Sequence, residues 1–123
     1  ITMLGISFKP DSDDLRDSPA LEISQRLTAL GAKVTVHDPV SLVPLATRSP
    51  ELLRNENLMS AATGAELVIL GTEWKQYRDI DPVELGAVVA VKTIIDGRNV
   101  LDVAKWQAAG WRVIALGRNV HNG

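Results

Sequence analysis

Short apolar runs alternate with helix-like segments along most of the chain, and this alternation limits the possible folds more than any other sequence feature. The runs are rich in Val, Ile and Leu and show no regular polar side, which is typical of strands that helices cover on both faces. Strands separated by helices pair in parallel through right-handed crossovers. The sequence therefore predicts a parallel sheet, and its expected strands are residues 2–7, 33–37, 67–71, 93–96 and 112–116.

The segments between these runs carry the start and stop signals of helices. Ser18 offers a hydroxyl N-cap before Pro19 at the first helical position, and Gly31 follows the last turn. Residues 40–55 contain prolines and are expected to form a loop with one or two short helical turns. The expected helices are residues 19–30, 56–63 and 102–109. Together these elements predict an α/β fold, a three-layer Rossmann-like domain with a mostly parallel sheet of about five strands.

Length and composition fit one soluble domain that spans residues 1–123. Hydrophobic residues make up 46% of the chain and charged residues 23%, which is close to the average of globular proteins. The 13 Lys and Arg are balanced by 15 Asp and Glu without a block of like charge, so neither a nucleic-acid nor a membrane partner is expected. The chain has no cysteine, which excludes disulfides, thiolate metal sites and a cysteine nucleophile.

The loop after the first expected strand is the first place to look for a ligand, because open parallel sheets bind ligands beyond the carboxyl ends of their strands. A dinucleotide-binding turn would carry G-x-G-x-x-G here, but Gly5 stands alone. Lys9 and Arg16 instead place two cations near the start of the helix at residue 19. The free N–H groups of a helix start also favour negative charge. The loop therefore fits a phosphate or a carboxylate ligand.

The same loop has plainer interpretations. Lys9 and Arg16 can instead neutralise the nearby aspartates, which gives exposed ion pairs of little energetic weight. The run of aspartates begins like a calcium loop, but Leu15 stands at its fifth position and the required glycine and terminal glutamate are missing. His37 and His121 show no metal-ligand spacing, so no metal site is expected.

Three motifs resemble a known family in their order and spacing. Residues 5–20 read G-I-S-F-K-P-D-S-D-D-L-R-D-S-P-A. They are similar to the G-x-x-F-K-x-x-T-D-D-x-R-x-S-P-A signature of the C-terminal, UDP-binding domain of the UDP-glucose/GDP-mannose dehydrogenase family, with Ser12 in place of the usual threonine. Residues 72–74 read T-E-W and residues 96–99 read D-G-R-N, as in that family. The T-E-W motif favours the UDP-glucose branch over the GDP-mannose branch.

The resemblance implies a part in a two-step oxidation. The family oxidises C6 of a UDP-hexose to a carboxylate with two NAD molecules and a cysteine thioester, and the UDP-glucose branch makes UDP-glucuronate. The chain has neither the glycine-rich NAD loop nor a cysteine. It is therefore expected to be the UDP-binding domain of a larger NAD-dependent enzyme whose NAD-binding and central regions are absent here. By itself it is expected to be inactive, and to contain no catalytic residue.

The resemblance also implies roles for four side chains. Phe8 and Lys9 match the pair that contacts the sugar nucleotide, and Arg98 matches the arginine of D-G-R that reaches the same substrate. Arg16 matches an arginine that faces the coenzyme held by the other domain. From the residues alone, Phe8 is interpreted as a core residue rather than a ligand contact, and Arg98 has the alternative of an ion pair with Asp96 or Asp102.

The remaining expectations concern partners and surroundings. The resemblance implies a UDP-sugar and the rest of the polypeptide as partners, a homo-oligomeric parent enzyme, a cytoplasmic location and a role in polysaccharide biosynthesis. The alternative is a stand-alone, non-catalytic module of the same fold that binds nucleotides or mediates assembly. Asp38, beside Pro39, is expected to be a turn residue rather than a ribose ligand. The three tryptophans, at positions 74, 106 and 111, are expected to pack in the core or between helices.

Overall fold

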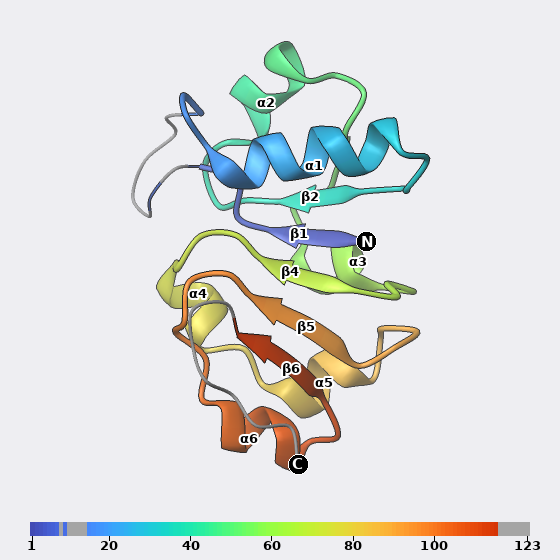
Figure 1. Cartoon of the computed structure of the whole chain (residues 1–123), viewed down its shortest axis with the longest axis vertical. Coiled ribbons are helices and arrows are strands. Elements are labelled where there is room, and N and C mark those ends of the chain that lie inside the picture. Colours follow the sequence, from blue (N-terminus) through green and yellow to red (C-terminus); the bar gives the residue numbers. More distant parts are fainter. Residues whose placement is uncertain (8, 10–14, 116–123) are drawn as a thin grey trace.

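A six-stranded parallel sheet forms the centre of the molecule (Figure 1). The computed structural model describes residues 1–7, 9 and 15–115. The strand order is β3-β2-β1-β4-β5-β6, and all five neighbouring pairs are parallel. This confirms the predicted α/β, Rossmann-like fold. The strands are β1 (Thr2–Leu4), β2 (Thr35–His37), β3 (Leu53–Arg54), β4 (Val68–Leu70), β5 (Thr93–Asp96) and β6 (Arg112–Ala115).

Six helices connect the described strands. The longest of them begins as predicted: the Ser18 hydroxyl accepts a hydrogen bond of 3.1 Å from the N–H of Leu21, and Pro19 occupies the first helical position. The other two predicted helices also form, with Asn57 and Asp102 as N-caps. The helices are α1 (Pro19–Ala29), α2 (Leu42–Arg48), α3 (Leu58–Ala62), α4 (Lys75–Arg78), α5 (Pro82–Gly86) and α6 (Val103–Ala108).

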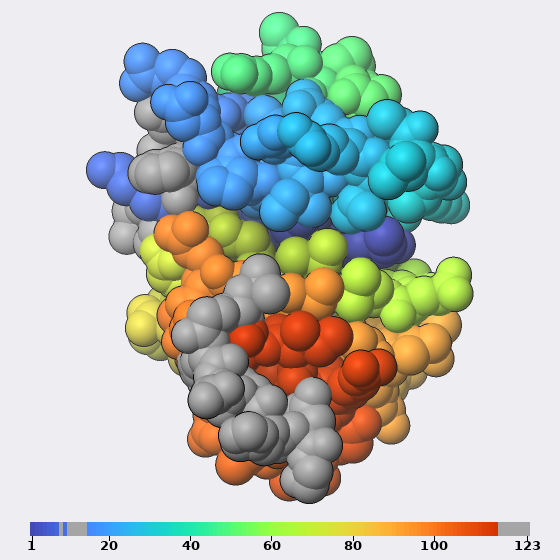
Figure 2. Space-filling model, in the orientation of Figure 1, coloured from blue at the N-terminus to red at the C-terminus, as the bar shows by residue number. Residues whose placement is uncertain are grey.

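The sheet separates the hydrophobic core into two clusters, one on each face, and helices cover both clusters. Met3 packs with residues of α1 and α2, whereas its neighbour Leu4 packs with residues of α3 to α6, because successive side chains of a strand point to opposite faces. Figure 1 shows α1 crossing one face of β1 and β2. Figure 2 shows that the blue atoms of α1 cover the upper half of this face, whereas red atoms of β6 reach the surface in the lower half.

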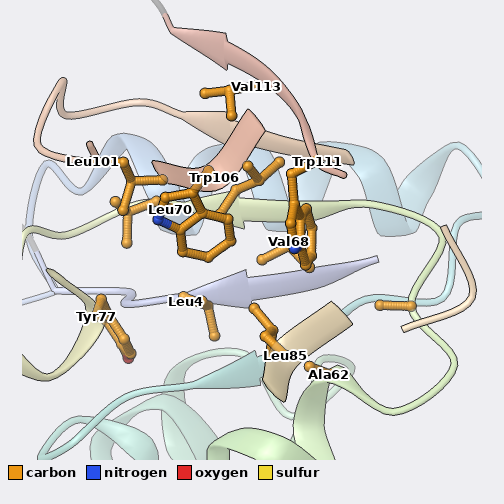
Figure 3. Packing of buried hydrophobic residues seen from close by; sticks show 12 residues of the cluster. Leu4, Ala62, Val68, Leu70, Tyr77, Leu85, Leu101, Trp106, Trp111 and Val113 are labelled. Atoms are coloured by element: carbon orange, nitrogen blue, oxygen red, sulfur yellow. The ribbon is translucent and has the colours of Figure 1, made fainter. Parts of the chain in front are cut away.

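Two tryptophans anchor the larger of these clusters (Figure 3). Trp106 and Trp111 are 1% and 3% exposed, and their rings meet edge to face with centroids 5.0 Å apart. The indole N–H of Trp111 donates to the carbonyl oxygen of Pro82 at 2.8 Å. Trp74 is partly buried against the same cluster. The expectation that the tryptophans are packing residues is therefore confirmed.

The structure adds elements that the sequence analysis missed. Residues 40–55 contain α2, but also the two-residue strand β3, whose side chains are both exposed and which therefore left no apolar run. The helix α5 begins at Asp81-Pro82, which repeats the cap-and-proline signal of Ser18-Pro19. By contrast, α4 has only four residues and follows Trp74, whose side chain makes no cap hydrogen bond.

Truncation of the buried indole tests the packing of the larger cluster. We expect Trp106→Ala to lower the free energy of unfolding by about 3–5 kcal/mol, because the lost ring leaves a cavity that the sheet cannot close. Urea unfolding followed by circular dichroism measures this loss. As a control, Val83→Ala on α5 alters a side chain that is 67% exposed. It should change stability by less than about 0.5 kcal/mol. A similar small loss for Trp106→Ala would contradict the described packing.

Candidate anion site at the carboxyl edge of the sheet

The carboxyl ends of three neighbouring strands are aligned at one edge of the sheet. Leu4 of β1 lies opposite Leu70 of β4, and Leu70 lies opposite Asp96 of β5. The loops that follow these strands carry Lys9, Glu73 and Arg98, so residues far apart in sequence start from adjacent positions. In an open parallel sheet, this edge between β1 and β4 is where the strand order reverses, which is the usual place of a ligand.

The strand β1 leaves the sheet through a turn that only glycine fits. Gly5 has φ +88°, and a Cβ atom built on it would lie 2.6 Å from the Cβ of Thr72. Both the left-handed backbone and the close approach of the neighbouring chain exclude a larger residue. The glycine therefore brings the start of the first loop directly against the residues that follow β4.

Buried side chains then hold the segment after Gly5. The Asp38 carboxylate accepts hydrogen bonds from the N–H groups of Ile6 at 2.9 Å and Ser7 at 3.4 Å. The Thr72 hydroxyl donates to the carbonyl oxygen of Ser7 at 2.7 Å. The Ser18 hydroxyl, which caps α1, donates to the carbonyl oxygen of Ile6. Side chains from three different parts of the chain thus fix the backbone of Ile6 and Ser7.

Lys9 is linked to this segment by a hydrogen bond. The Ser7 hydroxyl donates to the carbonyl oxygen of Lys9 at 3.1 Å, and the Lys9 side chain is exposed. An exposed ammonium group at this edge is suited to an anion, because it is a compact point charge on a flexible stem. Phe8, its predicted companion, lies outside the described residues, as do residues 10–14, which include most of the aspartates of the calcium alternative.

Arg98 forms an ion pair with Glu73. The guanidinium donates to the two carboxylate oxygens of Glu73 through Nε and Nη2, and each of the two side chains is 29% exposed. This pairing lowers the pKa of Glu73, with the hydrogen bond from Arg98 as the largest cause, and raises the pKa of Arg98. Glu73 belongs to the T-E-W motif, but the sequence analysis named only Asp96 and Asp102 as partners of Arg98. That choice of alternatives missed Glu73.

Asp96, at the end of β5, holds the backbone of the loop that carries Arg98. Its carboxylate accepts hydrogen bonds from the backbone N–H groups of Arg98 at 3.0 Å, and of Val100 and Leu101 at 2.9 Å each. Asn99 takes a left-handed conformation within this turn, with φ 59°. The buried aspartate therefore shapes the loop that presents Arg98.

Arg16 lies near the start of α1. It is exposed and stands two residues before Ser18, the N-cap of α1. Asp17 between them has a left-handed backbone with φ 54°. This places Arg16 at the surface beside the start of α1.

Asp38 is confirmed as a turn residue, and it also holds the segment after β1. In addition to Ile6 and Ser7, it accepts from the N–H groups of Val40 and Ser41 at 2.9 Å each, through its second oxygen. The residue is 3% exposed. Both carboxylate oxygens are therefore engaged by the backbone, which does not suit a ribose ligand.

A buried polar pair lies next to Asp38. The hydroxyl of Tyr77 lies 2.8 Å from Nδ1 of His37 and 3.1 Å from the carbonyl oxygen of the same residue, and the rings meet edge to face. Burial lowers the pKa of His37, against the opposing effects of the Asp38 charge and the Glu56 backbone. Burial is also the largest cause of the raised pKa of Tyr77. The pair links β2 to α4, the helix that follows the T-E-W motif.

Two pockets of similar size lie on the described surface, one at the carboxyl end of β2 and one at the amino-terminal edge of the sheet. A pocket of about 460 Å³ opens beside His37, and its walls include Val43, Glu56 and Gln76 but neither lysine nor arginine. A pocket of about 440 Å³ at the amino-terminal edge of the sheet contains Lys33 and Arg54. The acidic residues of the pocket beside His37 disfavour an anion. The pocket at the amino-terminal edge, with its two cations, is an alternative anion site that experiments must distinguish from the carboxyl edge.

Across residues 1–7, 9 and 15–115, no group of three or more His, Asp and Glu is arranged to hold a metal ion. Over the same residues, no helix has the length and apolar character needed to cross a membrane.

Comparison with known proteins identifies the family. The model of the UDP-glucose/GDP-mannose dehydrogenase family, UDP binding domain, matches residues 2–103. The chain belongs to this family. Within it, the chain is 33% identical to a UDP-glucose 6-dehydrogenase of Pseudomonas aeruginosa over 124 aligned positions, which cover 96% of this chain and 27% of the relative. A UDP-glucose 6-dehydrogenase of Bacillus subtilis is 30% identical over 96% of this chain and 26% of the relative.

Solved structures give the same assignment. An NDP-N-acetyl-D-galactosaminuronic acid dehydrogenase of Methanosarcina mazei is similar with a TM-score of 0.81 and 29% identity, over 94% of this chain and 24% of that chain. A UDP-glucose dehydrogenase of Pyrobaculum islandicum gives a TM-score of 0.70 and 30% identity, over 90% and 25%. The chain thus spans about a quarter of the length of these dehydrogenases, and corresponds to the UDP-binding domain of the family.

The ion pair of the site gives a pH dependence with a definite sign. The pKa of folded Glu73 is below its ordinary value of 4.5, so the ionised carboxylate stabilises the fold above that pH. The contribution is lost as the pH falls through 4.5 toward the lower folded pKa. We expect the stability advantage of the native chain over Glu73→Gln to be constant near pH 7 and to shrink below about pH 5.

Urea unfolding of both proteins at a series of pH values measures this difference. Subtracting the two profiles removes the contribution of His37 and of every other titrating group that the variants share. Parallel profiles down to about pH 3 would show that the Glu73–Arg98 pair does not stabilise the fold in solution.

Proposed function

We propose that this chain binds the UDP part of a UDP-hexose, as the C-terminal domain of an NAD-dependent UDP-glucose 6-dehydrogenase that makes UDP-glucuronate. One observation carries the proposal. The aligned ends of β1, β4 and β5 bring the loops of Lys9 and Arg98 to either side of the T-E-W loop, at the ligand-binding edge of the sheet. The family match supports UDP as the ligand.

The two cations suit a diphosphate in different ways. The Lys9 ammonium is an exposed point charge, whereas the planar guanidinium of Arg98 is held in a fixed plane by Glu73. A guanidinium has five N–H donors, so pairing with Glu73 through two of them does not by itself saturate it. We assign Lys9 and Arg98 to the phosphates, and Phe8 to the wall of the nucleotide pocket.

The described residues do not form a complete NAD site. The glycine-rich turn is absent, and the Asp38 carboxylate, which stands at the end of β2, is engaged by the backbone. NAD, which accepts the hydride in this reaction, is therefore proposed to bind mainly to the missing N-terminal domain. Exposed Arg16 is proposed to meet it across the domain boundary.

The contribution of this domain to catalysis is binding energy. No cysteine is present to form a thioester, so the covalent chemistry belongs to other parts of the enzyme. Holding the UDP part at a fixed place positions the hexose for that chemistry, which converts remote binding energy into rate. We extend the proposal, from the family alone, to a cytoplasmic, homo-oligomeric parent enzyme in polysaccharide biosynthesis.

Removal of one cation tests the location of the UDP site. We expect Lys9→Ala to weaken UDP binding about tenfold or more, because a hydrogen bond to a charged group contributes about 1.5–3 kcal/mol. Isothermal titration calorimetry measures the affinity. The matched control is Lys92→Ala, which removes an exposed lysine just before β5, at the opposite edge of the sheet. Equal losses for both variants, or no UDP binding by the native chain, would contradict the proposal.

A second prediction concerns chemistry. We expect the chain, mixed with UDP-glucose and NAD, to produce no NADH, because it has neither a thiol nor a complete coenzyme site. Absorbance at the NADH band measures the product. Protein-dependent turnover that persists through further purification would show that the catalytic machinery lies in this chain.

A further inference from the structure

Two consecutive residues after β4 contact the loops on both sides of them. Thr72 contacts the loop after β1 through the carbonyl oxygen of Ser7, and Glu73 contacts the loop after β5 through the guanidinium of Arg98. The strand order places β4 between β1 and β5, so these contacts bridge the middle of the site. The Thr72–Glu73 dipeptide therefore connects the two loops that carry the proposed cations.

The contact of Thr72 reaches the backbone of Lys9 through one intervening residue. Thr72 is fully buried, and its hydroxyl lies 2.7 Å from the Ser7 carbonyl oxygen. The hydroxyl of Ser7 in turn lies 3.1 Å from the Lys9 carbonyl oxygen. The opposite side of the same segment is held by Asp38 through the N–H groups of Ile6 and Ser7. Without the Thr72 hydroxyl, the Ser7 carbonyl loses this buried hydrogen bond.

The contact of Glu73 is made to the side chain of Arg98 rather than to its backbone. Two N–H groups of the guanidinium meet two carboxylate oxygens, a geometry that fixes the plane of the group as well as its position. Asp96 fixes the backbone of Arg98 separately, through its N–H. Glu73 therefore orients the charged end of Arg98.

We propose that Thr72 and Glu73 are positioning residues, which hold Lys9 and Arg98 at a set separation for the two phosphates of UDP. This inference rests on the proposed function, since it assumes that both cations bind UDP. Lysine and arginine lose much rotamer freedom when a ligand fixes them. Holding the loop of Lys9 and the charged end of Arg98 beforehand lowers that cost and raises affinity. The T-E of the T-E-W motif thus acts on binding without contacting the ligand.

Double-mutant cycles on UDP affinity separate positioning from general stabilisation. Thr72→Val is close in shape to threonine but lacks the hydroxyl, and we expect it to raise the Kd for UDP about fivefold. Thr72→Ser, which retains the hydroxyl, should restore the affinity. The loss caused by Thr72→Val should vanish in a Lys9→Ala background and persist in an Arg98→Ala background.

For Glu73→Gln we expect the opposite dependence on the two backgrounds. This variant keeps the size of the side chain but weakens the hydrogen bonds to the Arg98 guanidinium, so we expect it to raise the Kd for UDP about threefold or more. That loss should vanish with Arg98→Ala and persist with Lys9→Ala. Since Glu73 is partly exposed, this variant should fold even where Thr72→Val does not. All titrations are made well below the thermal midpoint of each variant.

The outcomes are distinguishable from a failure of the proposed function. If the native chain does not bind UDP, both proposals fall together. If it binds UDP and Lys9→Ala weakens binding, but the losses from Thr72→Val and Glu73→Gln are the same in every background, only the positioning role is overturned. An increase in affinity on Glu73→Gln would also overturn it, because the carboxylate would then act by repelling the ligand.

Discussion

The buried carboxylate of Asp38 is the group on which the backbone at the carboxyl edge of the sheet depends. It accepts hydrogen bonds from four backbone N–H groups, two after β1 and two in the turn that leads to α2. A carboxylate that is 3% exposed is costly unless such donors surround it. Asp38 therefore forces the turn after β2 and the segment before Lys9 into one arrangement, because any other would leave a buried charge without partners.

Asp96 repeats this solution at the end of β5, where it binds three backbone N–H groups around Arg98. Between the two aspartates, Thr72 and Glu73 join the neighbouring loops by one neutral and one charged contact. Buried polar side chains thus hold the backbone at this edge of the sheet, while the cations Lys9 and Arg98 lie closer to the surface. Such a rigid support is what a site needs when binding energy must serve chemistry elsewhere.

Most elements with strong local signals were predicted from the sequence, although α5, which begins with the same cap-and-proline signal as α1, was missed. The apolar strands, the Ser18 cap and the tryptophan core all follow from patterns within a few residues. The sequence analysis missed β3, whose two exposed residues pair with β2 only in the folded sheet. For the same reason it missed the Glu73–Arg98 pair: the residues are 25 apart in sequence, and only the adjacency of β4 and β5 brings them together. The roles of Phe8, Lys9, Arg16 and Arg98 stay predictions.

Mapping of UDP binding by amide chemical shifts shows where the ligand lies without altering the protein. We expect the largest shifts at Lys9, Thr72, Glu73 and Arg98, in the loops after β1, β4 and β5. Largest shifts at Lys33 and Arg54, which line the pocket at the amino-terminal edge, would contradict the proposed UDP site.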